Sequence, residues 1–265
     1  MVQGDTDLVA FCRATFGSRS IAVGGPAIGI AADRMIAKGR AIAAHLMEAD
    51  AGDVVFEDGR FSVAGTDRSL PFQEVVRIAF AAHQLPEGME PGLDAVALLA
   101  PKAPTYPKGC HVCEVEVDPE TGATAAVRYL VVDDVGTVLD HALLAGQVHG
   151  GVAQGLGQAL LEGTTYEPGS GQLHTASFMD YGIPRAVDMP PMDLHANPQP
   201  TQTNPLGAKG GGEAGTIGAP PAIINALVDA LRDHGVRHVE MPATPERVWR
   251  ALRNAQALQG SGRAG

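Results

Sequence analysis

Three consecutive glycines, Gly210, Gly211 and Gly212, lead directly into a single carboxylate, Glu213. Because glycine has no Cβ and permits positive φ, such a run lets backbone amides approach a ligand closely. These residue types suit the binding of a ligand through main-chain N–H groups, with one acid beside it. The alternative is an ordinary glycine-rich turn followed by a solvated glutamate, because glycine-rich loops are weak signals on their own.

The residues that follow Glu213 predict a helix. Pro220 and Pro221 suit a first turn, and apolar residues recur at helical spacing from Ala222 onward. We therefore expect a helix that begins just after the acid and runs around residues 222–234, and we place Glu213 on a tight loop before it. A further helix is expected over residues 245–252.

The cysteines offer a second type of chemistry. Cys12, Cys110 and Cys113 are too few and too unevenly spaced for a disulfide framework, and they suit a reducing compartment. The spacing of Cys110 and Cys113 could indicate a metal or redox site. However, the valines around them alternate with polar residues as in a strand, where positions three apart face opposite sides. With no second such pair to complete a zinc site, we expect structural cysteines.

The first part of the chain predicts helices and one hairpin. Residues 24–50 carry small and apolar residues at helical spacing, which indicates one long helix or two short ones broken at Gly39. Asp58-Gly59 stands between two alternating runs and predicts a hairpin over residues 54–63. Residues 69–84 favour a helix. Five prolines in residues 85–108 favour a linker and a subdomain boundary.

The second part of the chain predicts a sheet covered by helices. Residues 110–117 and 123–133 are expected to form a hairpin around the turn 118–122. Leucines and valines at helical spacing predict a helix over residues 140–161, with glycines that permit close packing. Short extended pieces near Thr165 and Ser177 and a proline-rich passage over 184–205 follow. The predicted fold class is α+β.

Composition limits the classes of partner. The net charge of −11 disfavours nucleic acid or an anionic membrane surface. The first seven residues have neither a cationic start nor an apolar core, and no window approaches the roughly 18 apolar residues of a spanning helix. With 265 residues, of which 45% are hydrophobic, the chain can bury a sizeable core. We expect a cytoplasmic protein that binds neither nucleic acid nor membrane.

Seven blocks occur in one order along nearly the whole chain. They are residues 4–7 (GDTD), 15–20 (TFGSRS), 114–122 (EVEVDPETG), 146–158 (GQVHGGVAQGLGQ), 177–181 (SFMDY), 203–207 (TNPLG) and 241–249 (MPATPERVW). Together they resemble the last part of the large, molybdopterin-binding subunit of the xanthine dehydrogenase, aldehyde oxidase and carbon monoxide dehydrogenase family, the molybdenum hydroxylases. The resemblance does not select one member.

The resemblance implies a mononuclear molybdenum held by the dithiolene sulfurs of a pyranopterin, so that no protein side chain need bind the metal. The cofactor would be a molybdopterin, in its cytosine dinucleotide form, with [2Fe-2S] and FAD groups on partner subunits or domains. The implied reaction oxidises an aldehyde, an N-heterocycle or a similar small substrate with water as the oxygen source. The protein would bind the pterin and its phosphate through amides and hydroxyls and supply one base.

Glu213 matches the glutamate that this family uses as its general base, and a positioned base contributes roughly 10²–10⁴-fold in rate. Gln147 resembles a glutamine near the molybdenum or the pterin, and its amide can both donate and accept. Lys209 and the amides of residues 210–212 would lie beside Glu213. Gln147 could equally be a solvated helix residue, and Lys209 could only offset charge.

Ser18, Arg19 and Ser20 match a loop that lies against the cofactor in this family. Hydroxyl and guanidinium donors are what phosphate and pterin acceptors require. The alternatives are that Ser18 caps a helix and that Arg19 pairs with a surface acid. His111 and His149 are assigned to the core or the surface by default.

The resemblance also implies the architecture. Residues 1–265 would form the C-terminal portion of the molybdopterin-binding domain, with the mixed sheets and helices of its second half and a subdomain boundary near 85–108. The chain contains no Gly-Gly-Phe-Gly motif and no first pterin-binding half. We therefore expect as partners the missing N-terminal half, an iron-sulfur subunit, an FAD subunit and a small-molecule substrate. We expect the chain to be inactive alone.

The sequence leaves one alternative functional class open and disfavours another. A non-catalytic structural or truncated module of the same fold, needing a partner chain, would also explain the missing upstream motifs. A P-loop or Rossmann nucleotide-binding protein is disfavoured, because residues 207–213 lack Gly-Lys-Ser/Thr and no GxGxxG follows a clear strand.

Overall fold

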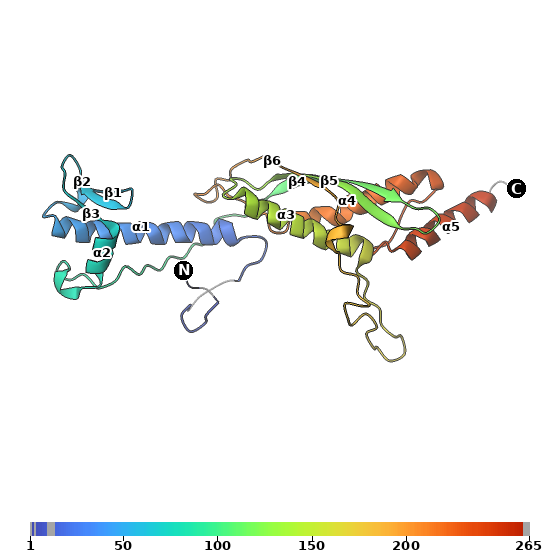
Figure 1. Ribbon diagram of the computed structural model, residues 1–265, viewed down its shortest axis with the longest axis horizontal. Coiled ribbons are helices and arrows are strands. Elements are labelled where there is room, and N and C mark those ends of the chain that lie inside the picture. The colour runs from blue at the N-terminus through green and yellow to red at the C-terminus, as the bar shows by residue number, and fades with distance from the viewer. Residues whose placement is uncertain (1, 3, 10–13, 262–265) are drawn as a thin grey trace. The chain divides into compact units, whose positions relative to one another are not determined.

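The structure, a computed structural model, describes residues 2, 4–9 and 14–261 of the chain, so Cys12 lies outside the described residues. Its internal contacts divide the chain into two compact units, one of residues 23–102 and one of residues 1–22 together with 103–265 (Figure 1). Each unit has its own hydrophobic core. The assignment of residues 1–265 to one domain with a boundary near 85–108 stays a prediction.

The unit of residues 23–102 combines most of helix α1 (Ser20–Leu46) with a small antiparallel sheet. The sheet has the order β1-β2-β3, with β1 at Val54–Glu57, β2 at Arg60–Val63 and β3 at Ser69–Pro71. Positive φ angles of 47° at Asp58 and 71° at Gly59 close the predicted hairpin. One helix, not two, covers the first segment. It is unbroken at Gly39, where the Phe61 ring packs so closely that a Cβ would stand 2.5 Å from it.

The prediction that residues 69–84 are all helical is wrong at its start. Residues 69–71 form β3, whose Leu70 pairs with Phe61 of β2, and helix α2 covers only Phe72–Ala79. Helical periodicity does not report this pairing, because three residues are too few to show an alternation of their own.

The other unit is built on the sheet β4-β5-β6, with β4 at Lys108–Val117, β5 at Thr124–Asp134 and β6 at Met192–Ala196. β4 and β5 form the predicted antiparallel hairpin, and β6 pairs in parallel with β5. β6 was not predicted, because it is short and lies inside a passage that its prolines mark as irregular.

Three helices complete this unit. α3 (His141–Leu156) continues as a π-helical turn, Gly157–Leu161, and together they confirm the helix predicted over 140–161. α4 (Ala214–Leu231) packs against β4, and α3 packs against α4 (Figure 1). α5 covers Pro245–Ser261, further than the predicted 245–252. Helices with mixed sheets confirm the predicted α+β class.

The start of α4 agrees with the expected helix just after the acid, but the proline pair lies elsewhere in it than predicted. The helix begins at Ala214, directly after Glu213, and Pro220 and Pro221 lie inside it instead of in its first turn. These prolines are tolerated in a helix that is held by packing, since Ala219 and Pro220 are buried and Gly155 of α3 lies against them. Glu213 is therefore the residue that directly precedes the helix.

The expectation that no window reaches the length of a spanning helix is wrong for Ala214–His234. This segment is long and apolar enough to cross a membrane by length and composition, with a mean hydropathy of 1.3. A buried core helix passes the same test, and α4 buries one face against α3 and β4. Its buried residues are Gly215, Ala219, Pro220, Ile223, Leu227 and Leu231.

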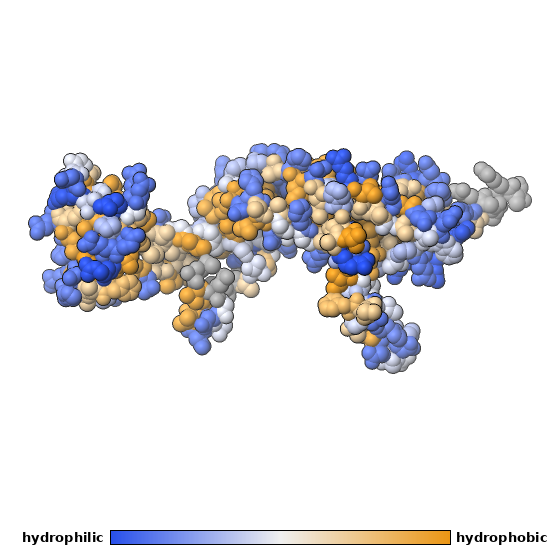
Figure 2. All heavy atoms as spheres, in the orientation of Figure 1, coloured by the Kyte–Doolittle hydropathy of each residue, from blue (hydrophilic) through white to orange (hydrophobic). Residues whose placement is uncertain are grey.

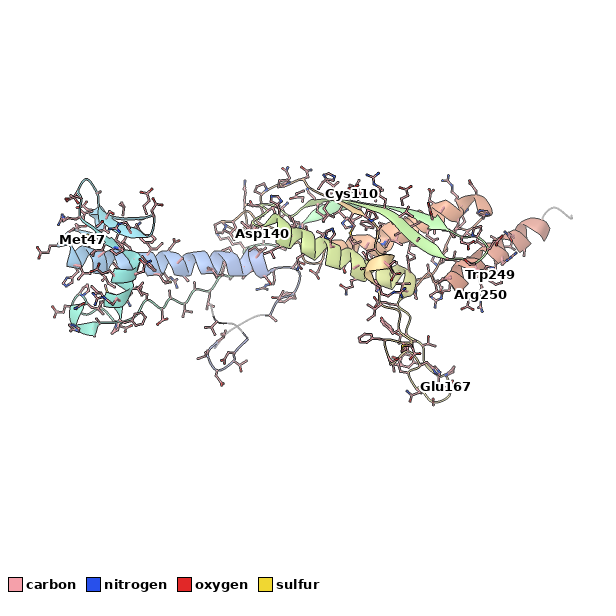
Figure 3. The ribbon with its side chains drawn as sticks, viewed as in Figure 1. Met47, Cys110, Asp140, Glu167, Trp249 and Arg250 are labelled. Atoms are coloured by element: carbon pink, nitrogen blue, oxygen red, sulfur yellow. The ribbon has the colours of Figure 1, made fainter. Side chains whose placement is uncertain are left out.

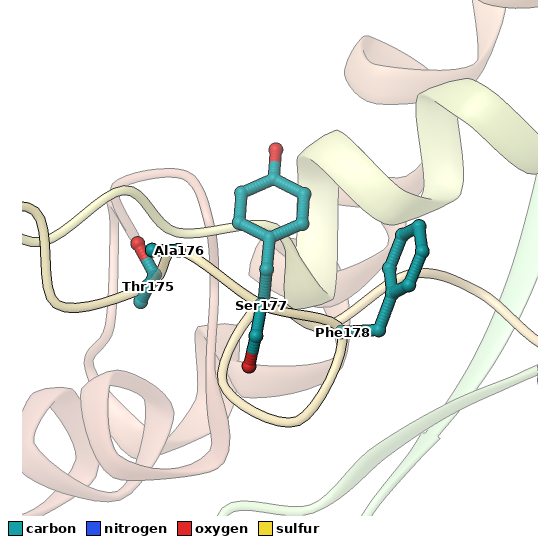
Figure 4. A pocket seen from close by; sticks show the side chains of 5 residues that line it. Thr175, Ala176, Ser177 and Phe178 are labelled. Carbon is teal, nitrogen blue, oxygen red and sulfur yellow. The ribbon is translucent and has the colours of Figure 1, made fainter.

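Residues 162–185, called the arm below, extend from the π-helical turn, with Glu167 near the end of the arm (Figure 3). A bridge between Tyr166 and Leu173 is the extended structure found near Thr165. Tyr181 Oη donates a hydrogen bond of 2.7 Å to Glu162 Oε2 and ties the arm to its base. A hollow of about 230 Å³ lies in the arm, lined by Thr175, Ala176, Ser177, Phe178 and Tyr181 (Figure 4).

Candidate functional site

Two hydrogen bonds join Ser18 to Glu213. Ser18 Oγ donates to Glu213 Oε2 at 2.6 Å, and the Glu213 backbone N–H donates to Ser18 Oγ at 2.9 Å. Glu213 precedes the first residue of α4, where the positive end of the helix dipole lies. The carboxylate is exposed, and among the described residues no partner holds its other oxygen, Oε1.

Of the glycines before Glu213, Gly210 is required by a close contact, and Gly211 lies in a tight one. A Cβ on Gly210 would stand 2.5 Å from Ser18 O and 2.7 Å from Ser18 Cβ. A Cβ on Gly211 would stand 3.1 Å from Leu144 Cδ1, at the start of α3. The first glycine thus lets residues from opposite ends of the chain meet, and the second lets the loop pass close to α3.

Gln147 lies beside the same loop. The position of a Cβ on Gly212 is 3.6 Å from Gln147 Oε1 and 3.5 Å from Ser18 Oγ. Over the part of the chain that is described, neither the Gln147 carboxamide nor the amides of residues 210–212 make a hydrogen bond. The structure thus brings together Ser18, Gln147, the glycine loop and Glu213, with several free donors among them.

Lys209 points into the protein. Its Nζ donates to Asp134 Oδ2 at 2.5 Å, and the two side chains are only 9% and 5% exposed. Burial alone would raise the pKa of Asp134, but hydrogen bonds from Lys209, Gly136 and Gln199 lower this pKa below its ordinary value. The amine is therefore committed to a buried carboxylate. Contact between Lys209 and a cofactor stays a prediction that this geometry does not favour.

Arg19 and Ser20 continue the Ser18 loop but contact other groups. The Arg19 guanidinium lies 4.7 Å from the centre of the Phe16 ring, a cation–π contact. Ser20 begins α1, and its Oγ lies 2.7 Å from Thr15 Oγ1. Neither side chain contacts Glu213 within the described structure, so their roles stay predictions.

A cavity of about 180 Å³ opens beside Glu213. Ser18 and Gly210 line it with Glu213, and so do Lys108, His111 and Asp133 of the sheet. The His111 side chain is 6% exposed, with Nδ1 3.0 Å from Tyr129 Oη and Nε2 3.4 Å from Asp133 Oδ1. Asp133 Oδ2 is buried without a hydrogen-bond partner among the described residues.

Sequence reasoning missed this side of the cavity. It placed His111 in the core or on the surface by default; the side chain is buried, in agreement with the first alternative, but it also lines the cavity, which was not predicted. One usable signal was present: Asp133 and Asp134 stand together at the end of a strand whose preceding residues, 130–132, are apolar. Adjacent carboxylates at a strand end require buried partners or a ligand.

Cys110 and Cys113 lie apart from the cavity lining. Cys110 is exposed on β4 (Figure 3), and Cys113 is half-buried against the core of the sheet. Burial, reinforced by Glu114, raises the pKa of Cys113 to about 11. In the residues that the structure describes, no three His, Cys, Asp or Glu side chains are placed to hold a metal ion.

Residues 1–190 match the family model described as the molybdopterin cofactor-binding domain. The chain belongs to this family. The matched residues of this molybdopterin cofactor-binding domain include Ser18 and Gln147, and Glu213 lies beyond them. The carbon monoxide dehydrogenase large chain of Hydrogenophaga pseudoflava is 39% identical over 252 residues, which cover 95% of this chain and 31% of that protein.

Solved structures share the fold of this molybdopterin cofactor-binding domain. Reconstituted CO dehydrogenase from Oligotropha carboxidovorans aligns with a TM-score of 0.83 and 33% identity, covering 95% of this chain and 31% of that one. Quinoline 2-oxidoreductase from Pseudomonas putida 86 aligns with a TM-score of 0.78 and 38% identity, covering 90% and 30%. The predicted resemblance to the large subunits of molybdenum hydroxylases is confirmed, and the chain spans about 31% of these relatives.

Proposed function

We propose that this chain forms part of the cofactor site of a molybdenum-dependent hydroxylase and that Glu213 is its general base. One observation carries the proposal: Glu213 Oε2 is held by Ser18 while Oε1 has no partner among the described residues, beside a cavity and a loop of free amides. A base needs this combination of a fixed position and an open oxygen.

The residues present fit a phosphorylated pterin. The free N–H groups of residues 210–212 suit phosphate or pterin oxygens, and Gln147 can donate to one atom and accept from another. When bound, the molybdopterin cofactor would supply a redox-active metal that accepts two electrons. The chain itself would orient the cofactor through these donors, and Glu213 would hold the transferred proton at Oε1.

The complete enzyme would contain more than this chain. Because the chain spans about 31% of the relatives it matches, we propose that it acts with the remaining part of a large subunit and is inactive alone. Iron-sulfur and FAD subunits, the cytosine dinucleotide form of the cofactor and a cytoplasmic location belong to the same proposal. The proposed substrate is an aldehyde, an N-heterocycle or a similar small molecule. An N-heterocycle has the support of the similarity to quinoline 2-oxidoreductase.

The proposal is tested by Glu213→Gln in the complete assembly. We expect turnover to fall roughly 10²–10⁴-fold, because the substitution removes the proton acceptor and keeps the shape of the side chain. Molybdenum per protomer should remain at the level of the unmodified protein. Glu116→Gln, at an exposed position of β4, is the matched control and should leave both quantities unchanged.

Metal analysis of the native assembly separates the proposed function from its alternative. Near-stoichiometric molybdenum with a larger partner is expected. Absence of both molybdenum and a partner would identify a non-catalytic module, and retention of most turnover by Glu213→Gln would remove Glu213 from the mechanism.

A further inference from the structure

We propose that Ser18 is a positioning residue that makes the two oxygens of Glu213 unequal, so that Oε2 is held and Oε1 takes the proton. This inference rests on the proposed role of Glu213 as the base. It assigns to Ser18 a task in the reaction that differs from contact with the cofactor.

The backbone of Glu213 fixes the direction of the Ser18 hydroxyl. Ser18 Oγ accepts a hydrogen bond from the Glu213 N–H at 2.9 Å, which occupies one side of the oxygen. The hydroxyl proton is then directed to Glu213 Oε2 at 2.6 Å, a distance typical of a strong bond to a charged acceptor. The backbone of Glu213 thus orients the group that holds its own side chain.

The backbone of Ser18 has an unfavourable conformation. Its φ of 53° lies in the left-handed region, which is unfavourable for a residue with a Cβ, and the preceding Gly17 has a similar φ of 57°. Glycine would adopt the conformation of residue 18 with less strain. A serine at this position indicates that the side chain is needed, as strained residues at functional sites often are.

Close packing against the glycine loop holds Ser18 in place. Gly210 approaches so closely that a Cβ there would be 2.5 Å from Ser18 O, so the two loops fix each other. A carboxylate without a partner can rotate and exchange its oxygens. With Oε2 held, rotation breaks a charge-assisted hydrogen bond, and Oε1 remains open at the exposed side.

The decisive variant is Ser18→Gly, which removes the hydroxyl and suits the positive φ, so that the backbone is retained. In the complete assembly we expect kcat to fall by about 10- to 100-fold with KM and molybdenum content unchanged, as for loss of one hydrogen bond to a charged group. Ser170→Gly is the matched control. The Ser170 hydroxyl also accepts a backbone N–H, from Gln172, but in the arm.

A second readout needs no activity. In the chain alone, hydrogen exchange at the Glu213 amide should become faster in Ser18→Gly, because this amide loses its acceptor. The neighbouring Lys209 amide, which is bonded to Val135 O, should keep its rate. Unchanged exchange at Glu213 would show that the hydrogen bond does not exist in solution.

A double-mutant cycle separates failure of this inference from failure of the proposed function. If Ser18 acts through Glu213, the Ser18→Gly/Glu213→Gln protein should be no slower than Glu213→Gln alone. A further loss in the double variant, or a loss of molybdenum in Ser18→Gly, would mean that Ser18 contacts the cofactor instead. Full turnover in Ser18→Gly with low turnover in Glu213→Gln would overturn the inference and leave the base intact.

Discussion

Asp134 connects three segments that are distant in the sequence. Its Oδ1 accepts from the N–H groups of Gly136 at 2.9 Å and Gln199 at 3.0 Å, and its Oδ2 accepts from Lys209 Nζ. The carboxylate at the end of β5 therefore fastens the following turn, the segment after β6 and the glycine loop. Because the glycine loop leads into Glu213, this buried ion pair helps to hold Glu213 in its position.

We expect Asp134→Asn to destabilise the unit by about 3–5 kcal/mol, because Lys209 would remain buried without its counter-charge. The lowered pKa of Asp134 means that the carboxylate stabilises the fold above its unfolded pKa of about 3.9, and that this contribution is lost as the pH falls through the folded value. Urea unfolding at pH 7 and in the acid range measures both effects. Asp229→Asn, in an exposed pair with Arg232, should change stability by less than about 1 kcal/mol.

The thiols should differ in reactivity. Cys110 is exposed, whereas Cys113 is half-buried with its pKa raised to about 11, so at pH 8 little of it is thiolate. We expect iodoacetamide to label Cys110 first and Cys113 only after unfolding, as followed by mass spectrometry of peptides. Equal labelling in the native chain would mean that β4 does not bury Cys113 as described.

At the level of single residues, the sequence predicted the centre of the site better than its surroundings. Glu213, Ser18, Gln147 and the glycines lie close together, while their roles stay predictions. The direction of Lys209 was not predicted, because its partner Asp134 is 75 residues away and local patterns do not show which residues meet across that distance. His111 was missed for the same reason, since only the sheet register and α4 place it beside the cavity.

Among the elements, the contact between α3 and α4 decides the geometry of the site. Gln147 belongs to α3, and α4 begins directly after Glu213. Glycines allow the two backbones to touch. A Cβ on Gly151 would stand 2.8 Å from Thr216 N, and one on Gly215 would stand 2.6 Å from Val148 O. Thr216 Oγ1 adds hydrogen bonds to Gly151 O at 3.0 Å and to Gln154 Oε1 at 2.9 Å.

Neighbouring glycines of α3 should respond oppositely to alanine. Gly151→Ala should destabilise the unit by about 1–3 kcal/mol, because the added methyl meets backbone atoms that cannot move aside. At Gly150 an added Cβ would meet no atom of another described segment within 4 Å, so Gly150→Ala should stabilise the unit by about 0.4–1 kcal/mol through helix propensity and chain entropy. Thermal unfolding compares the two variants. Equal effects would contradict the packing of α3 on α4.

The elements with strong periodicity were predicted, and those defined by pairing were not. The hairpins, α1 and α3 follow from local patterns that span many residues. β3 and β6 contain 3 and 5 residues and exist because a neighbouring strand is present. The place of Pro220 and Pro221 inside α4 was missed because prolines usually open a helix, and here tertiary packing retains them further along it.

At the scale of the whole molecule, the unit that contains the site exposes several large apolar side chains. Figure 2 shows apolar side chains gathered on the arm and near the start of α3. Phe178 and Met179 of the arm are 87% and 92% exposed, and Leu143 of α3 is 71% exposed. Patches of this kind mark interaction surfaces, which agrees with a chain that spans about 31% of its relatives.

We expect the isolated chain to bind a dye that reports exposed apolar surface and to self-associate as its concentration rises. The double variant Phe178→Ser/Met179→Ser should weaken both effects with little change in melting temperature, because neither side chain is buried. Val112→Ser, at a single exposed position of β4, is the control. Unchanged dye binding in the double variant would place the apolar surface elsewhere.

The residues joined by the hydrogen bond between Ser18 and Glu213 are 195 positions apart in the sequence. During synthesis the chain grows from its N-terminus, so Ser18 leaves the ribosome long before the acid that it must hold has been made. At about 5–20 residues per second, the interval is on the order of 10–40 s. Ordering of the glycine loop is therefore a late event in the life of the nascent chain. A group that requires both residues can be bound only after translation of the glycine loop is complete.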